Sequence, residues 1–176
     1  MSEKDVNKYE DMSAIKALRL ANHHYLLLPD IQRKYVWDTT DIEKLFESIV
    51  DGYPIGSCIF WKTNKKILNE NRPNLYQFIK EYTSEKTKNE KAPEILNDDE
   101  ENYYIVLDGQ QRITSLNIAL YGAYTKFRGG RGNAKSKSSN WLKRELYYNL
   151  NYYDVKEDEN ADEENYPKRF CFLTKD

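Results

Sequence analysis

The sequence has few of the side chains that bind metals or form disulfides. Its 176 residues include two cysteines, Cys58 and Cys171, and two histidines, His23 and His24. Each cysteine lies in an apolar run without metal-ligand spacing, which favours buried, reduced thiols. Adjacent histidines cannot share one helix face, and no third ligand is near them, so a solvated turn is expected there. The sequence therefore indicates neither a disulfide framework nor a zinc centre.

Long apolar runs and an excess of charge are also lacking. No stretch of about 18 apolar residues, the length of a membrane span, occurs, and residues 1–11 have no signal-peptide core. We therefore expect a cytoplasmic protein that is neither exported nor inserted in a membrane. The net charge is −2 and the pI is about 5.8, so any contact with a polyanion must come from a local patch.

Several catalytic signatures are missing as well. The sequence contains no Ser-His-Asp set, no HExxH, no CxxC pair and no GxxxxGK[ST] run, which excludes several common classes of hydrolase. Any catalysis by this chain would use Asp, Gln and Arg. Tyrosine, in contrast, is abundant, with 15 residues, and this side chain packs in cores, stacks on bases or lies at interfaces.

The hydrophobic periodicity predicts a mixture of helices and strands. Strands are expected at 25–28, 57–61, 103–107, 144–150 and 169–173, and helices at 12–18, 40–50 and 113–121. Thr40 and Glu43 have the spacing of a capping box at the start of the second helix, and Gly122 fits a C-cap at the end of the third. The last two strands bracket a loop and are predicted to form a hairpin.

The pattern along the chain predicts one main domain. We expect a helical lead-in over residues 1–24 and an α+β domain over 25–176, with an exposed insertion at about 64–102 that holds one short helix at 75–82. The basic loop 128–137 is either a phosphate contact or a plain flexible connection. The chain stops three residues after its last predicted strand, so we expect an N-terminal piece of a longer protein.

The most informative run is YYIVLDGQQRITSL, residues 103–116. An apolar strand pattern breaks at Asp108 and Gly109 and then resumes with helical spacing. The QQR triplet that follows places amide and guanidinium donors beside a predicted helix N-terminus, where free N–H groups and the macrodipole favour anions. The alternative is a plain Asp-Gly turn in which Asp108 caps the helix, and the residues alone leave both interpretations open.

Three polar junctions flank the predicted core strands, at residues 30–37, 53–57 and 108–114. If these strands share one sheet, the junctions meet at a crevice of the kind that binds ligands in mixed sheets. Arg33 and Arg112 would then offer forked donors to phosphate oxygens. The alternative is a surface role in which Arg33 pairs with a neighbouring aspartate.

Together, LPDIQRKYVW at residues 28–37, DGYPIGS at 51–57 and IVLDGQQRITSL at 105–116 resemble the N-terminal domain of GmrSD-type restriction endonucleases. This DGQQR family looks like a branch of the ParB/sulfiredoxin-like superfamily, and the similarity covers most of residues 25–175. It implies an α+β fold with a ParB-like core, a small mixed sheet flanked by helices, and a C-terminal β-hairpin. It also implies binding of a nucleoside triphosphate (NTP) with Mg²⁺, and in several members its hydrolysis, to control the cleavage of modified phage DNA.

In this family the cutting often belongs to a C-terminal or separate domain with a His-Asn-His nuclease motif. The present sequence has no such motif, because its only histidines are His23 and His24. We therefore do not expect nuclease activity from this chain alone. The partners that the resemblance implies are an NTP, a nuclease domain and DNA.

The resemblance and the residue chemistry together assign candidate roles. Asp108 and Gln110 would position a metal or an attacking water, and Gly109 would let the backbone approach phosphates closely. The predicted catalytic residues are Asp108, Gln110, Gln111 and Arg112, with Asp108 as the candidate metal ligand. The predicted nucleotide-binding residues are Gln32, Arg33, Tyr35, Trp37, Gly56, Ser57, Gly109 and Thr114.

Three hypotheses for the function remain open at this point. The first is an NTP-binding regulatory domain, with or without NTPase activity, of a phage-defence restriction endonuclease. The second is a DNA-binding or nicking ParB-like module that uses the basic loop on phosphates. The third is a domain that docks a partner without catalysis, through exposed tyrosines at 147–148 and 152–153.

Overall fold

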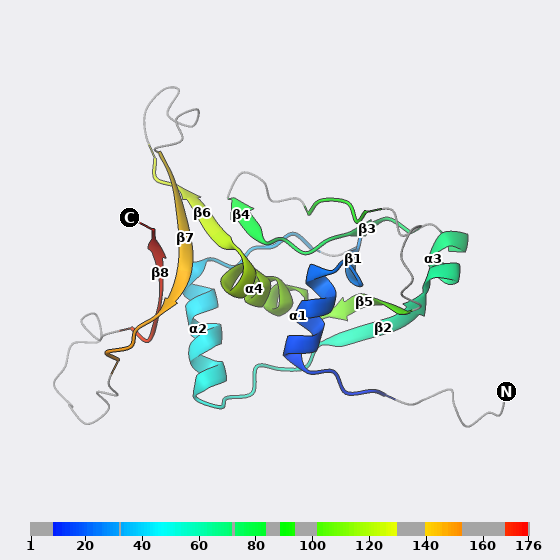
Figure 1. Ribbon diagram of the computed structural model, residues 1–176, viewed down its shortest axis with the longest axis horizontal. Coiled ribbons are helices and arrows are strands. Elements are labelled where there is room, and N and C mark those ends of the chain that lie inside the picture. Colours follow the sequence, from blue (N-terminus) through cyan, green and yellow to red (C-terminus); the bar gives the residue numbers. More distant parts are fainter. Residues whose placement is uncertain are drawn as a thin grey trace.

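The computed structural model describes residues 9–31, 33–71, 73–83, 89–93, 102–129, 140–152 and 168–175. Its helices are α1 (Ala14–Asn22), α2 (Thr39–Val50), α3 (Lys65–Asn71) and α4 (Gln110–Tyr121). Its strands are β1 (Leu26–Pro29), β2 (Ile59–Asn64), β3 (Leu75–Tyr76), β4 (Glu81–Thr83), β5 (Asn102–Asp108), β6 (Ala123–Phe127), β7 (Trp141–Tyr148) and β8 (Phe170–Thr174). Figure 1 shows how these elements are arranged, and they confirm the predicted α+β class.

The first sheet has the strand order β2-β5-β1-β3. β1 and β5 run parallel, with Leu26 opposite Tyr104, whereas β2 runs antiparallel to β5, with Phe60 opposite Val106. The sheet is therefore mixed, and β1 and β5 end at the same edge. One face is covered by α1 and α4, whose apolar side chains share a buried cluster with both strands.

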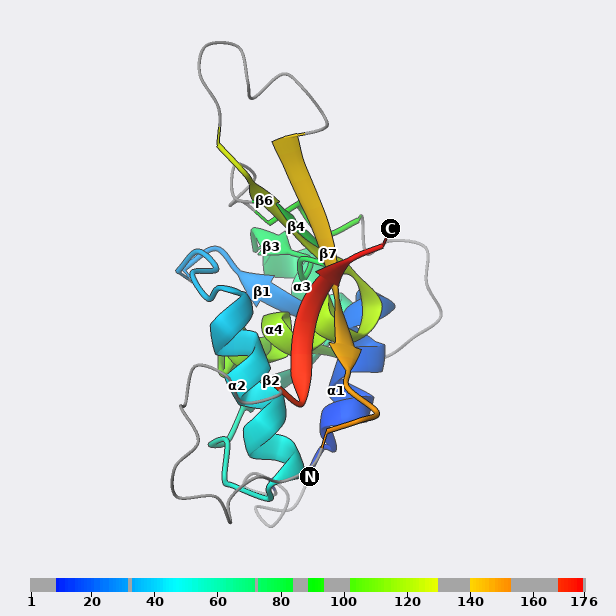
Figure 2. The same ribbon diagram turned by 90° about the vertical axis from the view of Figure 1, so that its left-hand side faces the viewer.

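Helix α4 lies in the middle of the molecule, against α1, α2 and the second sheet (Figure 2). Its buried residues are Gln110, Gln111, Ile113, Thr114, Ser115, Leu116, Asn117 and Ile118. Five of these eight residues are polar, so the helix carries polar groups into the interior instead of presenting them to water. Such groups need hydrogen-bond partners inside the protein.

The second sheet has the strand order β4-β6-β7-β8. β7 and β8 are antiparallel neighbours, with Leu146 opposite Phe172, which confirms the predicted C-terminal hairpin. The sheet packs on α2 and α4 through a second buried cluster that includes Tyr35, Tyr82 and Tyr124. No helix in the described part of the chain has the length and hydropathy of a membrane span.

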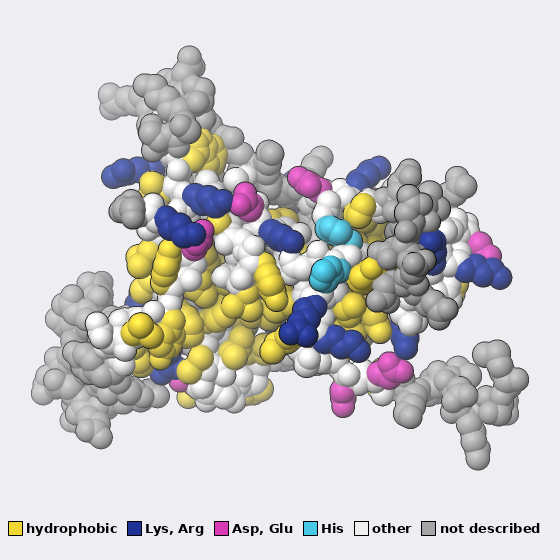
Figure 3. Space-filling model, viewed as in Figure 1, with side chains coloured by type: hydrophobic (Ala, Val, Ile, Leu, Met, Phe, Trp, Pro, Cys, Tyr) yellow, Lys and Arg dark blue, Asp and Glu magenta, His cyan; other side chains and the backbone are white. Residues whose placement is uncertain are grey.

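The face shown in Figure 3 carries a broad area of hydrophobic side chains over α4 and β7. Exposed hydrophobic residues of these elements include Leu120 and Tyr148, which are 55% and 52% exposed. Tyr147 is also exposed, Tyr152 is half-buried, and Tyr153 lies outside the described residues. Docking of a partner through these tyrosines stays a prediction.

Residues 64–102, for which we expect an exposed insertion, contain α3, β3 and β4 in their described part, with Leu68 and Tyr82 buried. The helix predicted at 75–82 is wrong, because β3 pairs with β1 and β4 pairs with β6. These short strands are held by pairing with distant strands, which local periodicity does not reveal. The basic loop 128–137 lies mostly outside the described residues.

Two further elements contribute to the core. α1 falls within the expected lead-in at 1–24, and its Ala17, Leu18 and Ala21 belong to the cluster shared with α4 and the first sheet. β6, which the periodicity does not predict, pairs with both β4 and β7. Its alternation is weak, since only Ala123 and Tyr124 are buried, so the local pattern gives little signal.

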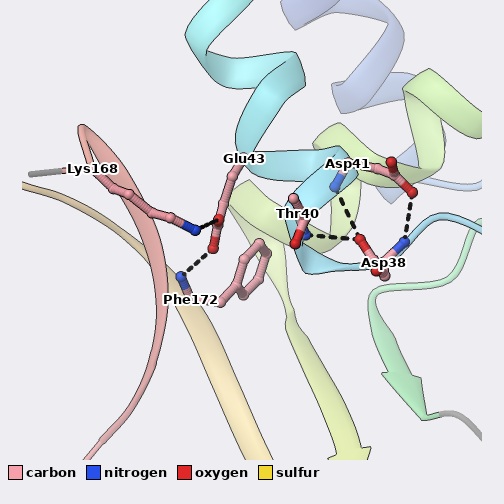
Figure 4. A network of polar contacts seen from close by, with 6 residues as sticks. All are labelled: Asp38, Thr40, Asp41, Glu43, Lys168 and Phe172. Atoms are coloured by element: carbon pink, nitrogen blue, oxygen red, sulfur yellow. Dashed lines mark hydrogen bonds and ion pairs between the residues drawn. The ribbon is translucent and has the colours of Figure 1, made fainter. Parts of the chain in front are cut away.

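The start of α2 is capped by Asp38, two residues earlier than predicted (Figure 4). Asp38 Oδ1 accepts hydrogen bonds from the N–H groups of Thr40 at 2.9 Å and Asp41 at 3.1 Å, and Asp41 Oδ2 accepts one from the Asp38 N–H at 3.1 Å. The capping box expected from Thr40 and Glu43 is therefore wrong. Asp38 and Asp41 have the same spacing and offer charged acceptors, which bind backbone N–H groups more strongly.

Glu43 takes no part in the cap, and its side chain contacts the second sheet instead (Figure 4). Its Oε1 accepts a hydrogen bond from the N–H of Phe172 in β8 at 3.1 Å, and its Oε2 accepts one from Lys168 Nζ at 3.0 Å. β8 is one of the two edge strands of its sheet in the described part of the chain. The carboxylate therefore occupies a backbone donor that an incoming strand would otherwise use.

Glu43, Glu47 and Asp51, the last of which is the C-cap residue of α2, form an acidic stripe along one side of this helix. Glu47 and Asp51 bind the guanidinium of Arg169, which precedes β8, with N–O distances of 3.5 Å and 2.7 Å. Arg169 also lies over the ring of Tyr152, at 4.6 Å from its centroid. The stripe joins one face of α2 to the β7–β8 hairpin.

We expect Glu43→Ala to destabilise the domain by about 1–2 kcal/mol, because the Phe172 N–H loses a partly buried acceptor. Glu43→Gln keeps an oxygen for this N–H and removes only the ion pair with Lys168, whose side chain is 61% exposed. That variant should lose less than about 1 kcal/mol. Urea unfolding measures both values, and equal destabilisation by the two variants would contradict the role given to the Phe172 contact.

Candidate functional site

The three polar junctions meet at one edge of the first sheet. β1 and β5 are parallel neighbours, so residues 30–37 and 108–112 follow strand ends at the same edge. β2 begins at this edge, because Ile59 lies opposite Asp108, and residues 53–58 therefore join the other two segments. The predicted convergence of the junctions is confirmed.

Gln110 and Gln111 hold the segment that follows β1. Gln110 Nε2 donates a hydrogen bond to the carbonyl of Arg33 at 2.8 Å. Gln111 Nε2 donates to the carbonyl of Lys34, and Gln111 Oε1 accepts from the N–H of Val36, both at 3.1 Å. Both glutamine side chains are buried, so these bonds satisfy polar groups that water does not reach.

Arg112 holds the segment before β2 in a similar way. Its Nη1 donates to the carbonyl of Ile55 at 2.7 Å, and its Nη2 donates to the carbonyl of Ser57 at 2.8 Å. Gly56 lies between these carbonyls with a φ of +79°, and a Cβ on it would clash with Arg112 Nη1. The guanidinium fork therefore requires glycine at this position. Nη2 also lies 3.5 Å from Asp108 Oδ2, which completes the set of contacts.

Gly109 brings the end of β5 against the third segment. Its φ is +91°, and a Cβ on it would clash with Cys58 Sγ. Burial raises the pKa of the Cys58 thiol, while the charge of Arg112 opposes this shift. Cys58 and Cys171 are both free and half-buried. The raised pKa of Cys58 keeps this thiol protonated, so it packs here as a small apolar group.

The N-terminal turn of α4 has no side-chain cap, since Gly109 occupies the N-cap position and makes no capping hydrogen bond. The alternative in which Asp108 caps the helix is therefore wrong: its carboxylate lies beside Arg112 instead. Two buried oxygens near this turn, Gln110 Oε1 and Thr114 Oγ1, make no hydrogen bond in the described part of the protein. They are one helical turn apart.

The predicted site residues divide into an outer and an inner set. The exposed ones are Arg33, Gly56, Ser57 and Asp108. The buried and half-buried ones are Tyr35, Trp37, Gly109, Gln110, Gln111, Arg112 and Thr114, and Gln32 lies outside the described residues. The side chains of Gln110, Gln111 and Arg112 in the inner set support the segments around them.

Tyr35 belongs to this inner support. Its hydroxyl is hydrogen-bonded to Ser115 Oγ at 2.8 Å, and burial raises its pKa above the ordinary range. Trp37 is half-buried, and its carbonyl accepts a hydrogen bond from the Tyr124 hydroxyl at 3.4 Å. The later part of the segment after β1 is therefore fixed to the core.

Ser115 and Asn117 are supporting residues that the sequence analysis missed. Asn117 is fully buried, and it donates to the carbonyl of Ile79 at 3.0 Å and accepts from Asn22 Nδ2 at 2.8 Å. The available signal was the run of polar residues inside an apolar helix, at positions 110, 111, 114, 115 and 117. Polar residues repeated at helical spacing in such a setting indicate an internal hydrogen-bond network.

Among the described residues, no three His, Cys, Asp or Glu side chains are grouped closely enough to hold a metal ion. The side chain of Asp108, the predicted candidate, is 66% exposed. Mg²⁺ commonly uses one or two carboxylates together with phosphate oxygens and water. Asp108 therefore fits Mg²⁺ only as part of a metal–phosphate complex.

The chain is therefore an α+β domain in which three polar segments converge at one end of the first sheet and are tied to the first turn of a buried central helix. We call this place the polar site. The family model for the GmrSD restriction endonuclease, N-terminal domain, matches residues 15–175. The chain belongs to this family, which confirms the resemblance. The ParB-like core stays a prediction.

One curated relative shows how much of a longer protein such a domain represents. Uncharacterized protein MJ0686 of Methanocaldococcus jannaschii is 32% identical to this chain over 116 residues. The match covers 64% of this chain and 17% of that protein. The chain therefore spans only a small part of this relative.

We expect Gly109→Ala to destabilise the domain much more than Gly52→Ala. Both glycines have positive φ, +91° and +74°, but a Cβ on Gly52 meets no atom within 4 Å. Gly52→Ala should therefore lose only the left-handed backbone term, about 1–2 kcal/mol, whereas Gly109→Ala adds the clash with Cys58. Urea denaturation of both variants tests this, and equal losses would contradict the close approach.

The two supports should act on different segments. Gln111→Leu should speed amide hydrogen exchange in residues 33–37 and leave residues 53–58 unchanged, and Arg112→Lys should do the opposite. Each variant removes hydrogen bonds worth about 1–3 kcal/mol, enough to raise local exchange at least fivefold. The variants serve as controls for each other, and the same exchange pattern in both would refute separate roles.

Proposed function

We propose that this domain binds an NTP with Mg²⁺ at the polar site and thereby regulates DNA cleavage by a nuclease partner in a restriction system. The observation that carries the proposal is the uncapped first turn of α4, which lies where three polar segments converge. Family membership supports the restriction role. The nucleotide, the DNA and the nuclease partner belong to the proposal.

The phosphates would lie at the N-terminal turn of α4. Backbone N–H groups and the positive end of the helix dipole favour an anion there. Arg33 is exposed on the adjacent segment and supplies a guanidinium that is suited to phosphate oxygens. Asp108 would hold Mg²⁺, which when bound neutralises part of the phosphate charge.

Gln110, Gln111 and Arg112 have a different role in this proposal. Most of their donors bind backbone carbonyls, so they set the positions of the segments that face the nucleotide. Holding these segments in advance reduces the conformational entropy lost on binding. The same arrangement supports binding whether or not the domain also hydrolyses the nucleotide.

Isothermal titration of each NTP with Mg²⁺ tests the proposal. Arg33→Ala should weaken binding about tenfold or more, since a hydrogen bond to a charged group contributes about 1.5–3 kcal/mol. Arg19→Ala is the matched control, because Arg19 is exposed on α1, before the opposite end of β1. Absence of binding for every NTP would refute the proposal.

A salt titration with duplex DNA separates the competing hypothesis. Binding to phosphates by a DNA module weakens steeply as salt rises. Salt-sensitive DNA binding without any nucleotide binding would favour the DNA-binding module over the nucleotide-regulated domain.

A further inference from the structure

An apolar patch lies directly beside the polar site and has no part in the contacts described above. It consists of Ile59 and Trp61 on β2 and Leu107 on β5, which are 49%, 49% and 55% exposed. Trp61 lies opposite Ile105, and the register of the two strands shifts between Ile59, which lies opposite Asp108, and Phe60. Leu107 stands at this shift, so the three exposed residues lie close together on two paired strands.

Trp61 is on the side of the sheet that faces away from α1 and α4, as is Ile105 opposite to it. Phe60 and Val106, which alternate with Trp61 and Leu107, pack into the cluster under those helices. Ile105 belongs to a separate buried cluster that also includes Leu68 of α3. Trp61 lies beside Ile105 on the neighbouring strand. Among the described elements β2 is one of the two edge strands of the sheet, so Trp61 is accessible from the side as well.

The patch continues into the polar site without a break. Leu107 immediately precedes Asp108, and Ile59 lies opposite Asp108. The first turn of α4 begins at Gln110, three residues after Leu107. Trp61 lies opposite Ile105, three residues before the end of β5 at Asp108, so at about 3.3 Å per residue it is on the order of 10 Å from that end, a distance that a nucleotide spans.

We propose that Trp61, with Leu107 and Ile59 beside it, is the platform on which the base of the bound nucleotide stacks. The inference rests on the proposed nucleotide binding. It adds a contact for the base, which the polar site does not recognise. An indole offers a broad apolar face to a flat heterocycle, and the two aliphatic neighbours carry no charge. Because every base has a π-face, stacking of this kind tolerates different bases.

The test compares a ligand that has a base with one that does not. ATP and inorganic tripolyphosphate, each with Mg²⁺, are titrated into the wild-type protein, Trp61→Ala and Trp61→Phe. Trp61→Ala should weaken ATP binding on the order of tenfold and leave tripolyphosphate binding unchanged, because stacking on a base contributes about 1–3 kcal/mol. Trp61→Phe keeps a ring and should recover most of the ATP affinity.

Tyr121→Ala is the matched control. Tyr121 is also 49% exposed, but it lies at the other end of the twelve-residue helix α4, about 18 Å from its first turn at 1.5 Å per residue. This variant should bind both ligands like the wild-type protein. Urea unfolding of all variants shows that they are folded.

The outcomes separate this inference from the function on which it rests. If the wild-type protein binds both ligands and Trp61→Ala leaves the affinity for ATP unchanged, the platform is refuted and phosphate binding stands. If Trp61→Ala weakens ATP and tripolyphosphate equally, its effect is structural and the platform is again refuted. If the wild-type protein binds neither ligand, both proposals fail.

Discussion

The whole arrangement depends on the hydrogen bonds between the buried polar side chains of α4 and two backbone segments. Gln111 binds the backbone of Lys34 and Val36, and Arg112 binds the carbonyls of Ile55 and Ser57. A buried donor without a partner costs about 1–3 kcal/mol, so neither segment moves away without a penalty. Because α4 also packs between the two sheets, the same helix fixes both the core and the positions of the two segments.

The residues of the DGQQR junction therefore have two kinds of position. Asp108 is exposed, as is Arg33 after β1, whereas Gln110 and Gln111 are buried and support the segment after β1 through hydrogen bonds. Gly109 permits this layering, because a side chain there would push Cys58 away from the end of β5. A cluster of amide and guanidinium donors in a sequence is consequently compatible with ligand contact and with internal support, and only the direction of each side chain distinguishes them.

Local signals account for the parts of the fold that the sequence predicts correctly. The strand before Asp108, the C-cap at Gly122 and the C-terminal hairpin follow from periodicity and turn chemistry over a few residues. The cap of α2 was misassigned because two overlapping boxes compete and the carboxylate of Asp38 wins over the hydroxyl of Thr40. β3, β4 and β6 depend on partners far along the chain, and so do the contacts of Gln111, 75 residues away from Val36.

Aromatic packing also connects the segment after β1 to the second sheet. Tyr35, in the segment that Gln111 holds, packs edge-on against Tyr82 of β4 with ring centroids 5.3 Å apart, and Tyr82 packs on Tyr124 of β6 at 4.6 Å. Burial raises the pKa of Tyr35 and Tyr124, so both rings stay neutral in the core. These rings belong to one buried cluster, so the segment after β1 and the second sheet share a packed core. Glu43 joins the same sheet, through the Phe172 N–H of β8, to α2, the helix that follows this segment. An unbroken series of contacts therefore connects the segment, the second sheet and α2.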